Sequence, residues 1–137
     1  MAVVKDLITV EADNTLSFGD YSLTAKTKKD NFQFEGDLYK IKTFKTITKL
    51  EKNGMMIYES VPGTAVHNFS VTDAVMAFKV EGPEDAQITV ELEPEKEYKV
   101  FVDDTNVGRM KTNLGGKLNI SIEMNQNQLV AVKIVKL

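Results

Sequence analysis

Apolar and polar residues alternate along most of this chain, and a period of two is typical of β-strands with one buried face. Residues 88–92 and 118–124 are the clearest examples, because every second residue there is Ile, Val, Leu or Met. Turn-forming residues separate such segments at intervals of roughly eight to twelve residues. No segment shows a convincing amphipathic helix. The pattern predicts an all-β fold, an antiparallel β-sandwich of immunoglobulin-like or jelly-roll-like type, in a single domain over residues 1–137.

Local signals predict where the strands begin and end. Residues 53–54 (Asn-Gly) predict a type I′ hairpin turn. Residues 19–20 (Gly-Asp) are expected to join two short strands as another hairpin, and residues 115–116 (Gly-Gly) to form a tight hairpin turn. The alternation changes face within residues 38–52, so we expect one long strand with a bulge or bend near Thr43. The expected strands are residues 4–10, 15–18, 21–25, 32–34, 38–52, 55–58, 65–71, 74–80, 87–92, 98–102, 118–124 and 130–134, with a polar turn at residues 125–128. A further short strand is expected between the polar turn that follows residue 102 and the Gly-Gly turn at residues 115–116.

The composition is that of a soluble globular protein without covalent cross-links. The 137 residues suit one domain with its own core, and the absence of cysteine excludes disulfides, thiol nucleophiles and thiolate metal sites. The N-terminus has no apolar signal-peptide core, and no apolar run is long enough to span a bilayer. We therefore expect a cytoplasmic protein without a membrane partner, although a signal removed beforehand would leave the same sequence.

The charges are unevenly distributed along the chain. The net charge of -3 and the pI of about 5.2 argue against nucleic acid as a partner. Residues 26–52 nevertheless carry eight lysines against four acidic residues, whereas residues 73–104 carry ten acidic residues against three lysines. This distribution predicts two solvent faces of different charge. A second interpretation is self-association through complementary charged patches.

Catalytic and metal sites have few candidate residues. His67 is the only histidine, so a Ser-His-Asp triad would depend on it, and no G-x-S-x-G turn is present to expose a serine. We interpret His67 as a structural residue. Residues 91, 93, 95 and 97 are all glutamate, which we interpret as one solvated strand edge, and residues 103–108 as a β-turn and not a calcium loop. The sequence predicts no catalytic residue, no metal ion and no cofactor.

Two sets of residues are candidates for binding. The first set is Tyr39, Phe44 and Tyr58, and the second set is Met55, Met56 and Ile57. Tyr39 and Phe44 lie among the lysines of residues 26–52, and Tyr58 follows them. The three could form an aromatic platform for a sugar or a polyanion. The second set is three consecutive apolar residues, of which a two-faced sheet must turn at least one away from the core. It predicts either an exposed interface patch or a strand buried on both faces.

Three segments carry a resemblance to a known family, namely EGDLYKIKTFKTITKLEKNGMMIYESVPGTAV, VEGPEDAQITVELEPEKEYKV and GRMKTNLGGKLNISIEM. They resemble small proteins from anaerobic Firmicutes that carry the label "endosialidase", and the resemblance covers essentially the whole chain. It implies a bacterial, intracellular, β-rich protein. Sialidase activity is not expected, because a sialidase holds its substrate carboxylate with several arginines on a six-bladed propeller. Arg109 is the only arginine here, and the chain is too short for that propeller.

These patterns predict a non-enzymatic binding or structural protein that acts through protein–protein contacts or self-association, as a homo-oligomer. The first alternative is a carbohydrate-binding module with a glycan as its ligand. The second alternative is a hydrolase of unknown substrate that uses His67 with a nearby carboxylate.

Overall fold

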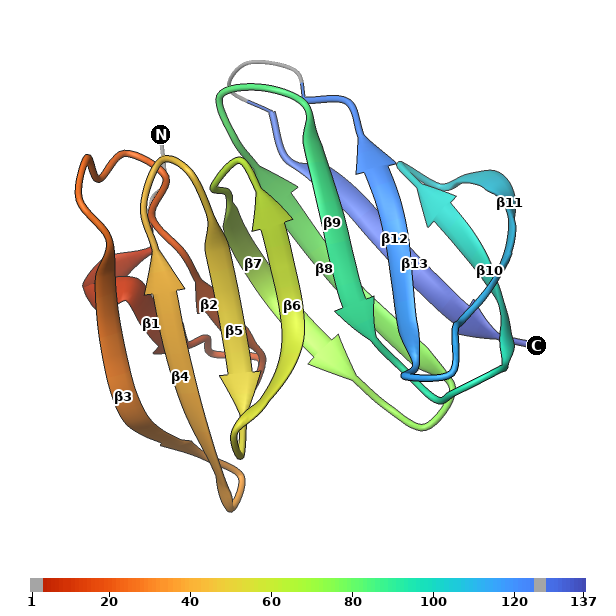
Figure 1. Ribbon diagram of the computed structural model, residues 1–137, viewed down its shortest axis with the longest axis horizontal. Helices are drawn as coiled ribbons and strands as arrows, with labels where there is room; N and C mark the ends of the chain where they lie inside the picture. The colour runs from red at the N-terminus through yellow and green to blue at the C-terminus, as the bar shows by residue number, and fades with distance from the viewer. Residues whose placement is uncertain (1–3, 125–127) are drawn as a thin grey trace.

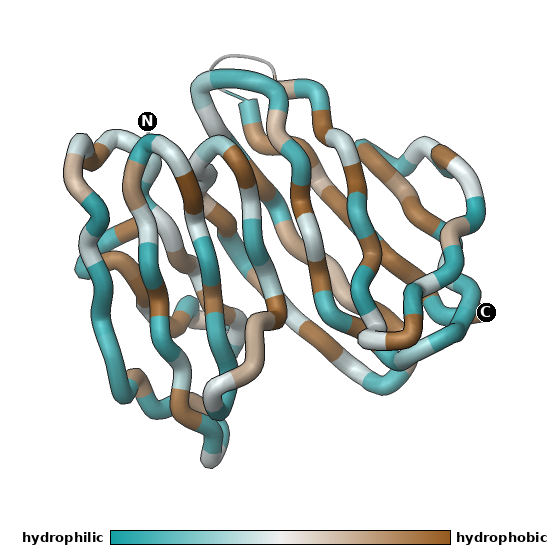
Figure 2. Tube along the Cα trace, in the orientation of Figure 1, coloured by the Kyte–Doolittle hydropathy of each residue, from teal (hydrophilic) through white to brown (hydrophobic). Residues whose placement is uncertain are grey.

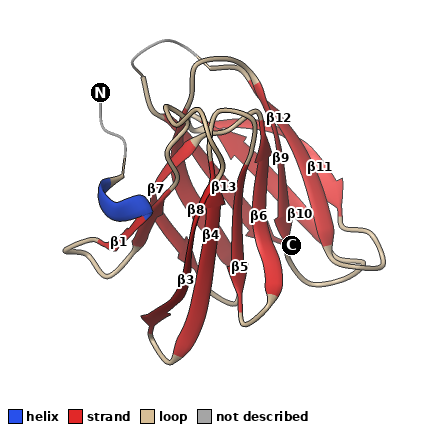
Figure 3. Cartoon of the chain, turned by 60° about the vertical axis from the view of Figure 1, so that its left-hand side comes forward, coloured by secondary structure: helices blue, strands red, loops and turns tan. Residues whose placement is uncertain are grey.

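Two antiparallel sheets packed face to face make up the structure (Figure 1). The computed structural model describes residues 4–124 and 128–137. Within these residues a seven-stranded and a six-stranded sheet enclose the core, and one 3₁₀ turn, η1 (Lys5–Leu7), precedes the first strand. Figure 3 shows the sheets as two layers, with η1 on the N-terminal side. The predicted all-β antiparallel sandwich is therefore confirmed.

The seven-stranded sheet has the strand order β1-β2-β7-β8-β13-β10-β11. The last strand of the chain, β13, is inserted between β8 and β10 and pairs antiparallel with both, so the C-terminal segment is held inside the sheet. The strands of this sheet are β1 (Ile8–Val10), β2 (Leu16–Phe18), β7 (Ala65–Val71), β8 (Val75–Glu81), β10 (Glu97–Val102), β11 (Thr105–Lys111) and β13 (Val130–Lys136).

The six-stranded sheet has the order β12-β9-β6-β5-β4-β3. Strands β3 to β6 follow one another as a meander, and β9 and β12 extend the sheet after the chain has visited the other layer. The strands of this sheet are β3 (Thr27–Phe34), β4 (Asp37–Thr43), β5 (Thr48–Lys52), β6 (Met55–Val61), β9 (Ala86–Glu91) and β12 (Lys117–Ile122).

Inward-facing side chains of both sheets form one core. Figure 2 shows hydrophobic and hydrophilic residues alternating along the strands, so each strand turns one face to the core and the other to solvent. Tyr58 of β6 meets Phe18 of β2 and Phe78 of β8 edge to face, with ring centroids 5.2 and 5.6 Å apart. Burying one side chain of this size contributes roughly 1.5–3 kcal/mol, so this aromatic cluster is a major link between the sheets.

The expected hairpin at residues 19–20 is wrong. Strand β2 pairs with β1 and β7, and residues 21–25 form no strand before the chain crosses to β3. Gly19 instead allows two segments to approach closely, because its φ is +99° and a Cβ there would lie 2.4 Å from the Thr64 carbonyl oxygen. The glycine that the sequence pattern assigned to a turn is therefore required by packing.

Residues 38–52 form two strands and not one bent strand. β4 ends at Thr43 and β5 begins at Thr48. Across the turn between them, the Phe44 N–H donates to the Ile47 carbonyl oxygen at 3.0 Å. The chain thus bends directly after Thr43, as one of the two expected alternatives, but the bend is a turn that ends one strand, and no bulge interrupts the β4–β5 ladder.

The other two predicted glycine turns have different outcomes. The turn at residues 53–54 is confirmed, since Asn53 and Gly54 both have positive φ, 52° and 83°, as a type I′ turn requires. Residues 115–116 form no hairpin, because the strands on either side of them, β11 and β12, lie in different sheets. Of the polar turn predicted at residues 125–128, residues 125–127 lie outside the described residues.

Candidate binding site at the open end of the sandwich

One end of the sandwich is open between the two sheets. Strand β4 starts at this end, β5 and β9 finish there, and the β7–β8 turn lies there in the other sheet, at the lower end in Figure 1. A cavity of about 320 Å³ opens at this end, and we call it the mouth cavity. Its lining comes from both sheets and includes Phe34, Tyr39, Ile57, Phe69 and Met76. This volume is at the lower end of the range of small-ligand sites.

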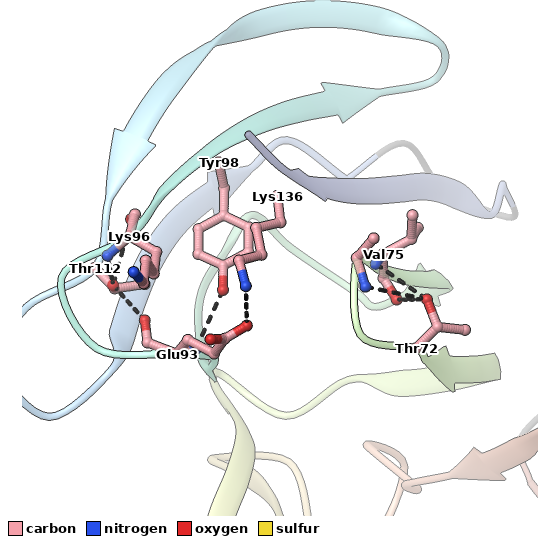
Figure 4. Close-up of polar contacts among 8 residues, drawn as sticks. Thr72, Val75, Glu93, Lys96, Tyr98, Thr112 and Lys136 are labelled. Carbon is pink, nitrogen blue, oxygen red and sulfur yellow. Dashed lines mark hydrogen bonds and ion pairs between the residues drawn. The ribbon is translucent and has the colours of Figure 1, made fainter.

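A second cavity of about 280 Å³ adjoins the mouth cavity. Three residues line both cavities, namely Val71, Met76 and Glu91. Figure 4 shows polar contacts around the second cavity, with the β7–β8 turn on one side and the contacts of Glu93 on the other. The turn is closed by Thr72, whose Oγ1 accepts a hydrogen bond from the Val75 N–H at 3.1 Å. The two cavities therefore lie next to each other at the open end.

Glu93 connects three segments at the wall of the second cavity (Figure 4). Its N–H donates to Tyr98 Oη at 3.1 Å, its carbonyl accepts from Thr112 Oγ1 at 2.6 Å, and Lys136 Nζ lies 2.5 Å from its carboxylate. The hydrogen bond from Lys136 lowers the pKa of the Glu93 carboxyl group, and the same bond raises the pKa of Lys136. Because these polar groups form their hydrogen bonds with one another, we assign this wall a structural role and not a ligand-binding one.

The four alternate glutamates do not share one strand edge, as the sequence had suggested. Glu91 is the last residue of β9 and pairs with Lys117 Nζ at 3.0 Å. Glu97 is the first residue of β10 and lies 3.6 Å from Arg109. The two glutamates between them belong to the connection that crosses from one sheet to the other. The crossing separates residues that a continuous strand would have kept on one face.

Tyr39 presents the hydroxyl group of the mouth cavity. Only 7% of Tyr39 is exposed, and the residue lines the cavity. Among the described residues its hydroxyl has no hydrogen-bond partner, and no unpaired side-chain polar atom is sealed from solvent, so the hydroxyl keeps contact with solvent. Burial raises the pKa of Tyr39, and the negative charges of Asp37 and Glu35 raise the pKa further. The phenol therefore stays protonated at neutral pH.

Asp37 is a carboxylate of the mouth cavity that is held by two neighbouring side chains. Asn53 Nδ2 donates to its Oδ1 at 2.8 Å, and Lys52 Nζ lies 3.5 Å from its Oδ2. The hydrogen bond from Asn53 is the largest cause of the lowered pKa of Asp37, and the Lys52 charge adds to it. Asp37 is therefore ionised at neutral pH and is already balanced by one lysine.

Glu35 is the carboxylate that lacks such a balance. It accepts a hydrogen bond from Asn14 Nδ2, and it has no cationic partner within the described part of the chain. With Asp37 and Glu91 it gives the cavity lining three carboxylates against one lysine. Glu35 and Asp37 were not predicted from the sequence. Their one available signal was their position on either side of the turn that leads into Tyr39.

The aromatic platform expected from the sequence does not form. Tyr58 is fully buried, and its hydroxyl bonds to Thr64 Oγ1 at 2.8 Å inside the core. Phe44 is half-buried in the turn after β4, at the end of that strand opposite the mouth. Of the three predicted ligand-binding residues, Tyr39 alone lines the mouth cavity. A sugar cannot stack on Tyr58, because burial leaves no ring surface for it.

The three consecutive apolar residues of β6 lie in different environments. Met55 is 60% exposed, whereas Met56 and Ile57 are half-buried and Ile57 lines the mouth cavity. The ladder between β5 and β6 shifts by one residue here, which leaves Ile57 as the extra residue of a bulge. The strand is therefore neither a continuous exposed patch nor buried on both faces. A role of Met55 in an interface stays a prediction.

Three lysines oppose one another on the outer face of the six-stranded sheet, and we call them the lysine row. Lys28 is opposite Lys42, and Lys42 is opposite Lys49. Lys49 lies 4.0 Å from Glu51, whereas Lys28 and Lys42 have no acidic partner among the residues described. The row accounts for part of the lysine excess in residues 26–52.

Replacing Lys42 by glutamine should stabilise the fold by about 0.5 kcal/mol at low ionic strength, because like charges directly opposite across strands destabilise a sheet. The gain should vanish at high salt, which screens exposed charges. Denaturant unfolding at the two salt concentrations measures both effects. Lys79→Gln is the control, since Lys79 is opposite His67 and Ala131 and no other lysine. An equal gain in this control would assign the effect to net charge.

His67 belongs to a chain of three hydrogen-bonded side chains. Its Nε2 lies 2.7 Å from one carboxylate oxygen of Glu81, and Tyr21 Oη donates to the other at 2.9 Å. Burial and the neighbouring Glu81 carboxylate raise the pKa of Tyr21 to about 12. These three side chains connect β7 and β8 to the segment before β3. None of them lines the mouth cavity or the adjoining one. This arrangement supports a structural role for His67, and the hydrolase stays a prediction.

Within the described residues, no group of three or more His, Asp or Glu side chains is placed to hold a metal ion. The same part of the chain contains no helix that is long and apolar enough to cross a membrane. No family model, curated protein or solved structure matches the chain. The family resemblance drawn from the sequence therefore stays a prediction, and the function has to be inferred from the geometry.

Proposed function

We propose that this chain is a non-enzymatic binding protein that self-associates through the free edge of β12. The two sheets leave four edge strands among the described residues, namely β1, β3, β11 and β12. An edge strand exposes unpaired backbone N–H and C=O groups, which can pair with a strand of another chain. The observation that carries the proposal is that β12 alone among these four is neither short nor interrupted by a bulge.

The other three edge strands are each protected in a recognised way. β1 has only three residues. The ladder of β3 is broken by a bulge between Lys29 and Phe32, and Lys28 and Lys29 place two positive charges on that edge. The ladder of β11 is also bulged, with Gly108 at a φ of +129° and Arg109 next to it. Short strands, bulges and charged residues are the means by which sheets avoid edge-to-edge pairing.

β12 is regular by comparison. It pairs with β9 over six residues without a bulge, and its apolar side chains all face the core. The Gly116 carbonyl accepts from the Leu92 N–H at 2.7 Å, and bonded and non-bonded pairs alternate in an antiparallel ladder. The backbone groups of Asn119 and Ser121 therefore point away from β9. They have no partner among the described residues and are available to another strand.

The residues before β12 define where the free edge begins. Asn113 already bonds both outward groups of Lys117, with its Oδ1 2.9 Å from the N–H and its own N–H 3.2 Å from the carbonyl oxygen. Leu114, in the same turn, is 81% exposed and provides apolar surface beside the edge. In a dimer with a two-fold axis, the free backbone groups of β12 would pair with those of the second copy, and the apolar surface of Leu114 would be covered. Asn119 and Ser121 of one copy would then pair with the equivalent residues of the other in reverse order.

Size-exclusion chromatography with light scattering should find a dimer at both low and high salt, because backbone pairing and apolar contacts are not screened. Ser121→Pro should give a folded monomer. Proline removes the outward N–H and blocks the edge, and that N–H makes no bond to β9. Asn119→Lys should also weaken the dimer, because it places a lysine of each copy on the paired edge, diagonal to the lysine of the other copy across the two-fold axis.

Val107→Lys is the matched control, because Val107 is 49% exposed on the edge strand β11 and the variant should remain a dimer. Circular dichroism would confirm that each variant is folded. A wild-type monomer at both salt concentrations, or a folded Ser121→Pro dimer, would contradict the proposal. A dimer lost only at high salt would also contradict it and would point to the oppositely charged faces.

A further inference from the structure

Independently of self-association, we infer that the mouth cavity binds an aliphatic ammonium group carried on an apolar stem. This chemistry is shared by the end of a lysine side chain and by a free alkylamine. The hydroxyl of Tyr39 and the carboxylates of Glu35 and Asp37 would hold the ammonium group. The stem would lie along the apolar lining contributed by Phe34 and Ile57.

The first argument is the unpartnered hydroxyl of Tyr39. The residue is more than nine-tenths buried, it lines the cavity, and its hydroxyl bonds to no other described residue. The hydroxyl itself keeps contact with solvent, so water can bond to it in the free protein and a ligand donor can replace that water. The hydroxyls of Tyr58 and Tyr98 are already engaged, because that of Tyr58 bonds to Thr64 and that of Tyr98 accepts from the Glu93 N–H. The Tyr39 hydroxyl is thus open to an N–H donor from a ligand.

The second argument is the sign of the charge around that hydroxyl. Three carboxylates and one ammonium line the cavity; Lys52 balances Asp37 and Lys117 balances Glu91, so Glu35, with only the Asn14 amide as a partner, provides the excess negative charge. The charges of Asp37 and Glu35 contribute to the raised pKa of Tyr39, so the negative potential extends to the hydroxyl itself. A cation gains from this potential, an anion is repelled, and a neutral sugar gains hydrogen bonds alone.

The third argument is the apolar lining and its continuation. Phe34 packs against Tyr39 with ring centroids 6.1 Å apart, so a second aromatic ring lies beside the ring that carries the hydroxyl. Aromatic faces attract ammonium groups and also contact the methylene groups next to them. The adjoining cavity shares Met76 and Glu91 with the mouth cavity and adds Asp73 to its lining. A stem that extends beyond the first cavity would therefore stay in acidic surroundings.

The test is calorimetric titration of the wild-type protein with pentylamine at neutral pH, beside pentan-1-ol and a methyl hexoside as neutral probes. Pentylamine should bind at least about tenfold more tightly than either neutral probe, and its affinity should fall as salt is added. Glu35→Gln should weaken the binding about three- to fivefold, in line with a partly exposed ion pair. Tyr39→Phe should weaken it about two- to tenfold, as the loss of one hydrogen bond does.

Glu84→Gln is the matched control, because Glu84 is an exposed acid in the β8–β9 turn at the other end of the sandwich. Equal binding of pentan-1-ol, preferential binding of the hexoside, or an equal loss in Glu84→Gln would overturn the inference. N-acetyl-lysine methylamide distinguishes the two sources of the ammonium group. Tighter binding of this compound would assign the site to a lysine side chain of a partner, and tighter binding of pentylamine to a free amine.

Discussion

Replacing Tyr58 by alanine should reduce the free energy of unfolding by about 3–5 kcal/mol, the usual cost of deleting a buried aromatic side chain. Tyr58 has no exposed surface, and its ring contacts Phe18, Phe69 and Phe78 edge to face. These contacts join β6 to three strands of the opposite sheet. Domains of this size are stable by only about 5–15 kcal/mol, so denaturant unfolding would show a large shift of the midpoint.

Two variants identify the cause of that loss. Tyr58→Phe keeps the ring and removes the hydroxyl that bonds to Thr64, and it should cost about 1 kcal/mol. Met55→Ala lies on the same strand but changes a side chain that is 60% exposed, and it should change stability by less than about 0.5 kcal/mol. A Tyr58→Ala variant as stable as Met55→Ala would mean that Tyr58 is not a core residue. It would then revive the aromatic platform.

Replacing Gly116 by alanine should cost about 2–5 kcal/mol, more than an ordinary surface substitution. Gly116 has a φ of +80°, and a Cβ there would lie 2.2 Å from the Leu92 carbonyl oxygen. The backbone would have to move apart, and the hydrogen bond from the Leu92 N–H to the Gly116 carbonyl would be strained or lost. That bond lies next to the β9–β12 ladder, so β12 should lose order with it.

Gly54→Ala separates the two parts of this effect. Gly54 has nearly the same φ, +83°, but no atom lies within 4 Å of the position of a Cβ. Its replacement should cost only the backbone term of about 1–2 kcal/mol. Chemical denaturation of both variants measures the difference, which is the cost of the steric overlap. Equal losses in the two variants would show that Gly116 is required for its dihedral angle alone.

The strands of this protein were largely predictable because their signals are local. Residues 88–92 and 118–124 alternate clearly, and both fall mainly within strands, β9 and β12. The Asn-Gly turn at residues 53–54 was also predictable, since its two positive φ angles depend on those two residues themselves. Local patterns of this kind need no knowledge of the remaining chain.

The candidate site was predictable only in part. Tyr39 and Tyr58 have similar neighbours in the sequence, yet one lines a cavity and the other is sealed in the core. Their difference arises from position along the sandwich, because Tyr39 lies near the open end and Tyr58 faces Phe18 of the opposite sheet. Glu35 becomes part of the site because the β3–β4 hairpin ends at the mouth. No local pattern contains that information.

The local sequence pattern does not determine which distant segments pair with one another. That pairing is decided by packing in the folded molecule. Gly19 and Gly116 were both assigned to hairpin turns, but in the structure both lie where the chain approaches another segment closely. A period of two is the same whether the next strand pairs as a hairpin or crosses to the other sheet. The alternation therefore specifies strands and the faces they bury. The competition among long-range contacts selects their partners, as when β13 is inserted between β8 and β10.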